Sequence, residues 1–208
     1  MANNIKIFVE GIADGKFLKD YISYIKPGYE MSKETIIDTG GWTHIDSQKA
    51  KGEGIQNQMK QNTECGGTNL VIFDADKDFN TRKQEIESWK SKYKIDFELF
   101  LLPNNQDIGA LEDLLEKIII ESNHPILDCW DKFESCIQSN ASQAMGRSLT
   151  IPAKKTKIYA YLEVLLGVTK KEKENIKESN RNYGDKGHWH LDSDFLGPLK
   201  AFLQRYIP

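Results

Sequence analysis

Hydrophobic residues in the first 120 positions alternate between short runs and helical spacing. Short, partly β-branched apolar runs predict four β-strands, at residues 5–10, 34–38, 70–73 and 97–102. Apolar residues spaced three and four apart predict intervening helices, at residues 14–25, 46–62, 81–93 and 110–120. Strands that alternate with helices are typical of a parallel sheet covered by helices on both faces. We therefore predict an α/β fold over residues 1–120, with a four-stranded, mostly parallel sheet flanked by helices.

Beyond residue 120 the strand pattern disappears. Helical spacing recurs at residues 126–138 and 154–167, and again from residue 192 onward. The stretch between them, residues 167–191, is polar and charged and contains glycine, so we expect a loop or a lid there. The prediction for residues 121–208 is a C-terminal helical extension packed on the α/β core.

Composition bounds the class of protein. No apolar run approaches the roughly 20 residues that a membrane-spanning helix requires, and the first residues lack the apolar core of a signal peptide. The three cysteines are odd in number and show no Cys-x-x-Cys spacing, which favours free thiols in a reducing compartment. We expect a cytoplasmic protein without a membrane partner.

Charge is distributed unevenly along the chain. Residues 141–208 carry 12 Lys/Arg against 7 Asp/Glu, whereas residues 1–140 carry 16 against 24. An acidic body with a basic tail is compatible with a metal site beside a phosphate-binding surface. A solvated helix face explains the Lys/Glu mixture of the tail equally well, and the sequence pI of about 5.9 is below that of a typical nucleic-acid binder.

The third predicted strand ends in a run of carboxylates. Its apolar residues 70–73 are followed by Asp74, Asp76 and Asp78 at alternate positions. Ligands of α/β proteins bind at the carboxyl ends of strands, and acids packed there repel one another unless a cation lies between them. Oxygen ligands without a nearby Cys or His suit Mg²⁺, Mn²⁺ or Ca²⁺. The sequence therefore predicts a divalent-metal site at this strand end.

Two further acids occupy comparable places. Glu10 ends the first predicted strand, and Glu112 lies in the first turn of the helix that follows the fourth. If these strands are neighbours, the acids converge on one edge of the sheet. Such a cluster holds one or two divalent ions that polarise a phosphate and lower the pKa of a water nucleophile, while a further carboxylate moves protons.

Two other interpretations of the acidic run compete with this one. The spacing of Asp74, Asp76, Asp78, Asn80 and Glu85 matches an EF-hand calcium loop. Against that loop, its sixth position is not the glycine that the turn requires, and a strand precedes it where a helix is needed. Alternatively, the aspartates only cap a helix or form a turn, but this leaves Glu10 unexplained.

Two sequence stretches together resemble the Toprim (topoisomerase–primase) domain. They are FVEG at residues 8–11, followed by Asp14, and FDADKD at residues 73–78. The later LLP at 101–103 and GALEDLL at 109–115 are similar to small stand-alone bacterial Toprim-like proteins, related to nucleases of the overcoming-lysogenisation-defect type. The resemblance covers residues 5–120 and implies a Rossmann-like Toprim fold.

The resemblance also implies roles for individual residues. Glu10 would be the general acid/base or a metal ligand, and Asp74 and Asp76 would hold Mg²⁺ or Mn²⁺, which makes Glu10 and Asp74 the candidate catalytic residues. Asp78 would support the site, and Glu112 would complete a second metal site.

Candidate substrate-binding residues flank the acids. Gly11, Asp14 and Lys16 follow Glu10 directly, and Lys186 and His188 lie in the polar stretch that we predict as a loop or lid. If that stretch folds over the site, Lys186 or His188 reaches a phosphate. His188 and His190 also form a potential metal pair, but no third ligand is near in sequence, and an ordinary polar loop is the better interpretation.

The function predicted from the sequence is divalent-metal-dependent hydrolysis or transfer of phosphodiester bonds in nucleic acid, DNA or RNA. The alternative is a non-catalytic module that uses Mg²⁺ to bind a nucleotide or nucleic acid and works with a partner ATPase. The weakly acidic net charge of −3 and the lack of a second nucleic-acid-binding module motivate that alternative.

Overall fold

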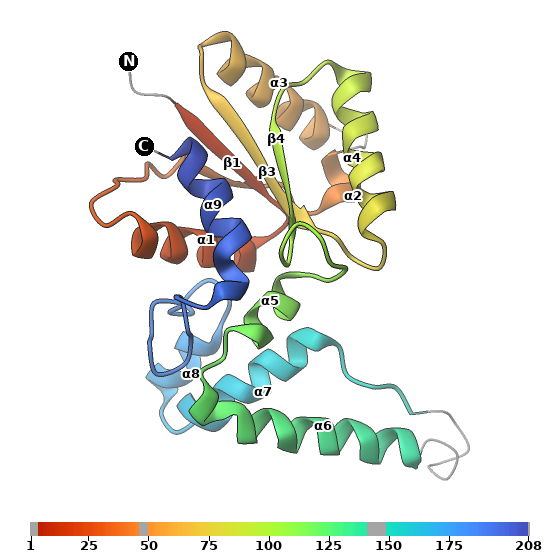
Figure 1. The fold of residues 1–208 in the computed structure, drawn as a ribbon, viewed down its shortest axis with the longest axis vertical. Coiled ribbons are helices and arrows are strands. Elements are labelled where there is room, and N and C mark those ends of the chain that lie inside the picture. Colours follow the sequence, from red (N-terminus) through yellow and green to blue (C-terminus); the bar gives the residue numbers. More distant parts are fainter. Residues whose placement is uncertain (1–3, 46–49, 141–148, 208) are drawn as a thin grey trace.

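A four-stranded parallel sheet forms the centre of the molecule. The computed structural model describes residues 4–45, 50–140 and 149–207, and its strands are β1 (Ile5–Val9), β2 (Ile36–Asp38), β3 (Thr68–Asp74) and β4 (Glu98–Leu102). They lie in the order β2-β1-β3-β4, and each neighbouring pair is parallel (Figure 1). The predicted α/β class and parallel four-stranded sheet are confirmed.

The two faces of the sheet are covered by different helices. Because side chains alternate along a strand, Ile7 and Val9 face one hydrophobic cluster, whereas Phe8 faces another. The first face is covered by α1 (Ile12–Ile25) and α9 (Gly197–Tyr206), and the second by α2 (Trp42–Ile45), α3 (Ala50–Glu64) and α4 (Phe79–Tyr93) (Figure 1). Burial on both faces explains why the strands read as continuous apolar runs.

The strand order creates a switch point between β1 and β3. The chain leaves β1 through α1 to reach β2 on one side, and leaves β3 through α4 to reach β4 on the other. Because connections between parallel strands share the same handedness, α1 and α4 lie on opposite faces of the sheet. The two connections lead in opposite directions from the carboxyl ends of β1 and β3. Open α/β sheets bind ligands at such a position.

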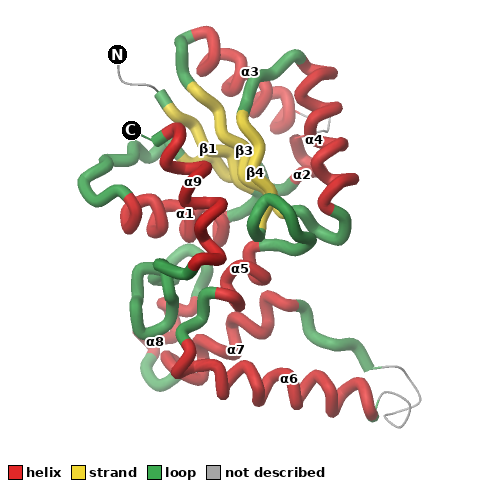
Figure 2. Tube along the Cα trace, in the orientation of Figure 1, coloured by secondary structure: helices red, strands yellow, loops and turns green. Residues whose placement is uncertain are grey.

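The remaining elements lie beyond the carboxyl edge of the sheet. They are α5 (Leu111–Lys117), the 3₁₀ helix η1 (Glu121–Asn123), α6 (His124–Ser139), α7 (Lys154–Leu166), α8 (Lys170–Ile176) and the 3₁₀ helix η2 (Asp194–Leu196). Figure 2 shows this part as helices and loops below the yellow strands. The last helix, α9, returns to the sheet, where Phe202 packs on Phe100 of β4 with ring centroids 5.2 Å apart. Within the described residues, no helix is long and apolar enough to cross a membrane.

Two expectations from the sequence differ from the structure. The helix predicted over residues 46–62 corresponds to α3, whereas the short helix α2 precedes that range and residues 46–49 lie outside the described residues. The loop predicted over residues 167–191 is wrong in part, because it contains α8. The Thr169 and Glu172 side chains cap that helix reciprocally, with Thr169 N–H donating to Glu172 Oε2 at 2.7 Å. Tyr183 and Trp189 are buried in the core, so this stretch is packed structure.

Candidate metal centre

Glu10 and Asp74 meet at the switch point of the sheet. Val9 pairs with Ile72 in the parallel ladder, so Glu10 and the last residue of β3 emerge at the same edge. The backbone N–H of Asp74 donates to Glu10 Oε1 at 3.2 Å. The convergence of these two acids, inferred from their positions after apolar strands, is therefore present in the folded chain.

Asp14 reaches the same edge from the first turn of α1. Its Oδ2 accepts the Gly11 N–H at 3.0 Å, which ties the start of the helix to the turn after Glu10. A Cβ at position 11 would lie 3.3 Å from that oxygen, so glycine leaves room for the carboxylate. Asp14 is only 7% exposed, and its Oδ1 is buried without a hydrogen-bond partner. A buried carboxylate oxygen without a partner is costly.

A loop carries the start of α5, and with it Glu112, toward Asp74. Asp76 N–H donates to Gly109 O and Gly109 N–H donates to Asp76 O, both at 2.8 Å. The Leu111 N–H then donates to Asp74 Oδ1 at 3.0 Å. Gly109 has a φ of +138°, and a Cβ there would lie 2.7 Å from Asp113 Oδ2, so this turn requires glycine.

Asp74 and Asp14 are affected by burial and by the charges of the neighbouring acids. Burial, together with the charges of Asp14, Glu10 and Glu112, raises the pKa of Asp74 to about 9. Burial likewise raises the pKa of Asp14 to about 7, with contributions from Glu10 and Glu112. Burial also raises the pKa of Glu10, although the Asp74 N–H and the Arg82 charge oppose the increase. We call Glu10, Asp14, Asp74 and Glu112 the acid cluster.

The acid cluster is not arranged as a finished coordination sphere. In the described part of the chain, no group of three or more His, Cys, Asp or Glu side chains is placed to hold a metal ion. The charges that raise the pKa values of Asp74 and Asp14 act over longer distances than coordination, which requires oxygens about 2.0–2.6 Å from the ion. Binding would therefore require the side chains to turn toward one another.

The Asp76 carboxylate pairs with a positively charged side chain of the protein. The residue adopts a left-handed φ of +54°, and its carboxylate forms an ion pair with Arg82. The Arg82 side chain is 15% exposed, lies over the Trp42 ring at 5.8 Å and lowers the pKa of Glu10 by its charge. Arg82 therefore holds Asp76 at the margin of the acid cluster.

Asp78 caps a helix. Its Oδ1 accepts the Thr81 N–H at 3.0 Å at the start of α4, and hydrogen bonding to Thr81 lowers the pKa of Asp78. The capping interpretation from the sequence therefore holds for Asp78. The EF-hand interpretation is wrong, because β3 enters this segment where that motif needs a helix.

The candidate substrate-binding residues fall into two groups. Gly11, the N-cap of α1, donates its N–H to Asp14 of the acid cluster, and Lys16, one turn into α1, contacts Asp20 Oδ1 through Nζ at 2.6 Å. Lys186 and His188 are held elsewhere: Lys186 lies over the Tyr24 ring at 5.9 Å, and His188 packs edge-on against Tyr161 at 6.4 Å.

The stretch that carries Lys186 and His188 is held by hydrogen bonds at both ends. Ile119 and Trp189 form an antiparallel bridge, and the Tyr183 N–H donates to Asp20 Oδ2 at 2.9 Å. In this structure Lys186 packs on α1 and His188 on α7, and the approach of either residue to a phosphate stays a prediction. His190 donates its backbone N–H to Ile118 O at 2.6 Å.

The sequence did not reveal the positions of two residues of the site, Asp14 and Arg82. Asp14 was expected beside the substrate, yet it is a full member of the acid cluster. Its position four residues after Glu10, at the start of a helix, is the signal that indicates this. Arg82 was not singled out, because a lysine- and arginine-containing helix such as α4 does not reveal which cation turns back toward the strand end.

The chain is thus an α/β protein with an acid cluster at the topological switch point of its sheet. A family model described as "Protein of unknown function (DUF3226)" matches residues 4–208, and the chain belongs to this family. Comparisons with curated proteins and with solved structures give no match.

Proposed function

We propose that the acid cluster binds Mg²⁺ or Mn²⁺ and that the protein hydrolyses or transfers phosphodiester bonds in nucleic acid. The observation that carries this proposal is the buried, unpartnered Asp14 Oδ1 among four carboxylates at the switch point. Uncompensated negative charge in a buried site is stabilised by a cation. No cation of the described chain is paired with Asp14 or Asp74.

The chemistry of the donor set fits a hard divalent ion. The cluster offers carboxylate oxygens only, which suits Mg²⁺ or Mn²⁺ better than a metal that prefers nitrogen or sulfur. Glu10, Asp14, Asp74 and Glu112 would hold the ion, and Asp76 would join them on leaving Arg82. A bound ion would polarise a phosphate and lower the pKa of water.

The residues themselves supply the remaining chemistry. Glu10 is half-buried, and burial raises its pKa, so its carboxyl is better suited to accept and return a proton than an exposed one. Arg82 lies between Asp76 and Glu10 and supplies positive charge for a phosphate. The likeness of residues 8–11 and 73–78 to the Toprim motifs supports the same reaction class.

The test is cleavage of labelled DNA and RNA, single- and double-stranded, with Mg²⁺, Mn²⁺ or EDTA. Wild type is compared with Glu10→Gln and Asp74→Asn, and with Asp96→Asn as a matched control. Asp96 is an exposed aspartate at the opposite end of the sheet, with a side chain that is 75% exposed.

Metal-dependent cleavage by wild type and Asp96→Asn, and its loss in both cluster variants, is the expected result. Equal cleavage by all four proteins would show that the activity arises elsewhere. Calorimetry that detects Mn²⁺-dependent binding of an oligonucleotide without turnover would instead favour the alternative of a non-catalytic module that works with a partner ATPase.

A further inference from the structure

A cleft of about 340 Å³ lies between α1 and β2, and Gly11 is one of its lining residues. One wall is α1, and the other is formed by residues 31–33 together with β2. Ile12, Met31 and Ile36 are apolar residues among those that line it. Ile12 is 58% exposed, although it is a large hydrophobic residue. The volume lies at the small end of the roughly 300–1,000 Å³ typical of ligand pockets.

Three lysines line this cleft, namely Lys16, Lys19 and Lys33. Lys16 is paired with Asp20, whereas Lys19 and Lys33 are exposed and have no carboxylate partner among the described residues. One acid, Asp38, also lines the cleft, and its Oδ1 accepts the Gly40 N–H at 2.7 Å. The cleft therefore carries a surplus of positive charge.

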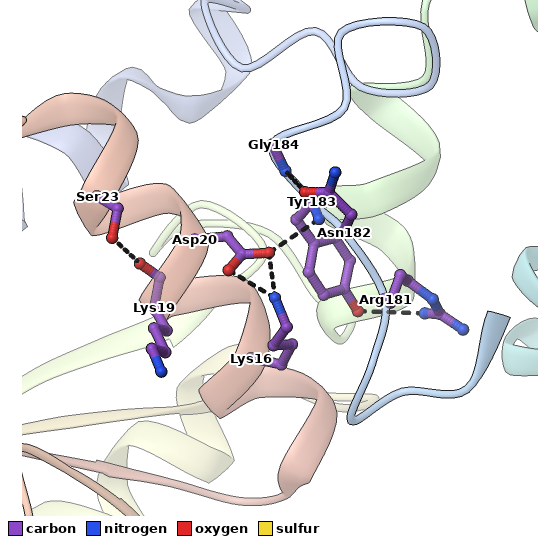
Figure 3. A network of polar contacts seen from close by, with 8 residues as sticks. All are labelled: Lys16, Lys19, Asp20, Ser23, Arg181, Asn182, Tyr183 and Gly184. Atoms are coloured by element: carbon purple, nitrogen blue, oxygen red, sulfur yellow. Dashed lines mark hydrogen bonds and ion pairs between the residues drawn. The ribbon is translucent and has the colours of Figure 1, made fainter. Parts of the chain in front are cut away.

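The C-terminal part of the chain supports the lysines on α1. Figure 3 shows Tyr183 beside Asp20, whose carboxylate accepts the Tyr183 N–H at 2.9 Å and also binds Lys16. Tyr183 packs edge-on against Phe17 with ring centroids 5.3 Å apart. In the same view the Lys19 amine points away from the Lys16–Asp20 pair. Lys19 is therefore available to an anion in the cleft.

The cleft and the acid cluster share one element. Gly11 lines the cleft and donates its N–H to Asp14 of the cluster. A phosphate held at the acid cluster would therefore lie next to a positively charged cleft between α1 and β2. A polymer of phosphodiesters is a ligand that uses both places at once, because it carries a negative charge on every unit.

We infer that this cleft holds the phosphate backbone of a single nucleic-acid strand that continues from the acid cluster, an inference that rests on the proposed function. Lys19 and Lys33 bind phosphates, and Ile12 and Met31 contact the sugars. None of the described lining residues is aromatic, so bases do not stack here, and contacts to phosphates and sugars alone do not depend on the sequence. The small volume suits one strand and excludes a duplex.

The experiment measures binding separately from cleavage. Fluorescein-labelled single-stranded DNA and RNA of 12 nucleotides, in several sequences, are titrated with the full-length protein in EDTA, from 50 to 200 mM salt. The variant is Lys19→Ala/Lys33→Ala. The matched control is Lys83→Ala/Lys132→Ala, which removes two exposed helical lysines without carboxylate partners outside the cleft. Circular dichroism and thermal unfolding establish that both variants fold.

The expected result is a loss of about tenfold in affinity for Lys19→Ala/Lys33→Ala at low salt, uniform across sequences. The slope of log K against log salt should become shallower by about 1.4, since each lysine–phosphate contact on a single strand contributes about 0.7. The control double variant should match wild type. An unchanged slope in the cleft variant, equal losses in both variants, or no binding by wild type would overturn the inference.

Two further arms separate related outcomes. The same titration is repeated with a duplex oligonucleotide and with a free nucleotide. If the affinity for either falls as much in Lys19→Ala/Lys33→Ala as the affinity for the single strand does, the assignment of a single strand as the ligand is overturned. If wild type binds single strands through the two lysines but cleaves no nucleic acid with any metal, the proposed reaction fails while the cleft assignment stands.

Discussion

Two acidic regions lie within a few residues of each other at the end of β3, and they differ in burial and in partners. The acid cluster combines Asp74 with three acids from elsewhere in the chain, and burial together with the neighbouring charges raises the pKa values of Asp74 and Asp14. Asp76 and Asp78, by contrast, are paired with Arg82 and with the Thr81 N–H. Neighbouring aspartates of one motif thus have different tasks, because burial and partners decide what a carboxylate does.

The largest expected effect separates the two regions by activity. Asp74→Asn keeps the shape of the side chain and its contact with the Leu111 N–H but removes a charge from the acid cluster. We expect metal-dependent cleavage to fall at least about 100-fold, whereas Asp78→Asn should retain activity within about threefold. Initial rates of cleavage at saturating Mn²⁺ measure both. Equal losses in the two variants would show that the regions act as one site.

The second prediction concerns pH. A carboxyl whose pKa is raised in the folded state binds more protons folded than unfolded, so stability decreases as pH rises above its unfolded pKa of about 4. The metal-free protein should therefore lose stability from pH 5 to pH 9, through the pKa values of about 7 for Asp14 and about 9 for Asp74. Each proton contributes at most about 1.4 kcal/mol per pH unit.

Urea unfolding at several pH values, with EDTA or with Mn²⁺, measures this loss. Asp74→Asn should flatten the dependence, and Mn²⁺ should stabilise wild type more at pH 8 than at pH 5. A stability that is independent of pH in EDTA would contradict the burial of uncompensated charge in the acid cluster.

The third prediction tests the boundary between the two regions. Arg82→Gln releases Asp76 from its ion pair and removes a positive charge near Glu10. Mn²⁺ affinity, measured by calorimetry, should increase several-fold, because the arginine and the metal compete for the same carboxylate. Turnover should nevertheless decrease if Arg82 contacts the phosphate. A decrease in Mn²⁺ affinity would mean that Arg82 instead positions Asp76 for the metal.

The smallest expected effect belongs to Asp78. Asp78→Ala removes the cap of α4 and leaves the Thr81 N–H without its acceptor. Loss of such a cap should lower the melting temperature by about 2–4 °C, with Mn²⁺ affinity unchanged. Asp78→Ser, which can still cap the helix, should restore most of the loss. A reduced metal affinity in Asp78→Ala would show that Asp78 takes part in metal binding.

Much of the fold could be predicted because its signals are local. Alternating apolar residues and intervening helical spacing indicate β1, β3, β4 and their helices, and burial on both faces makes each strand strongly apolar. The helix α8 was missed because its sequence is dominated by charged residues, so periodicity is weak there. Its reciprocal cap at Thr169 and Glu172 is a local signal that would have found it.

The sequence by itself determined that acids follow strands one and three, because strand ends are marked by an abrupt change from apolar to charged residues. Only the tertiary structure decided which acids share a buried environment. The parallel pairing of β1 with β3 joins Glu10 to Asp74 across 64 positions, and the Asp76–Gly109 bridge carries Glu112 toward them. Burial and electrostatic interactions depend on distance in space, which the spacing of residues along the chain does not specify.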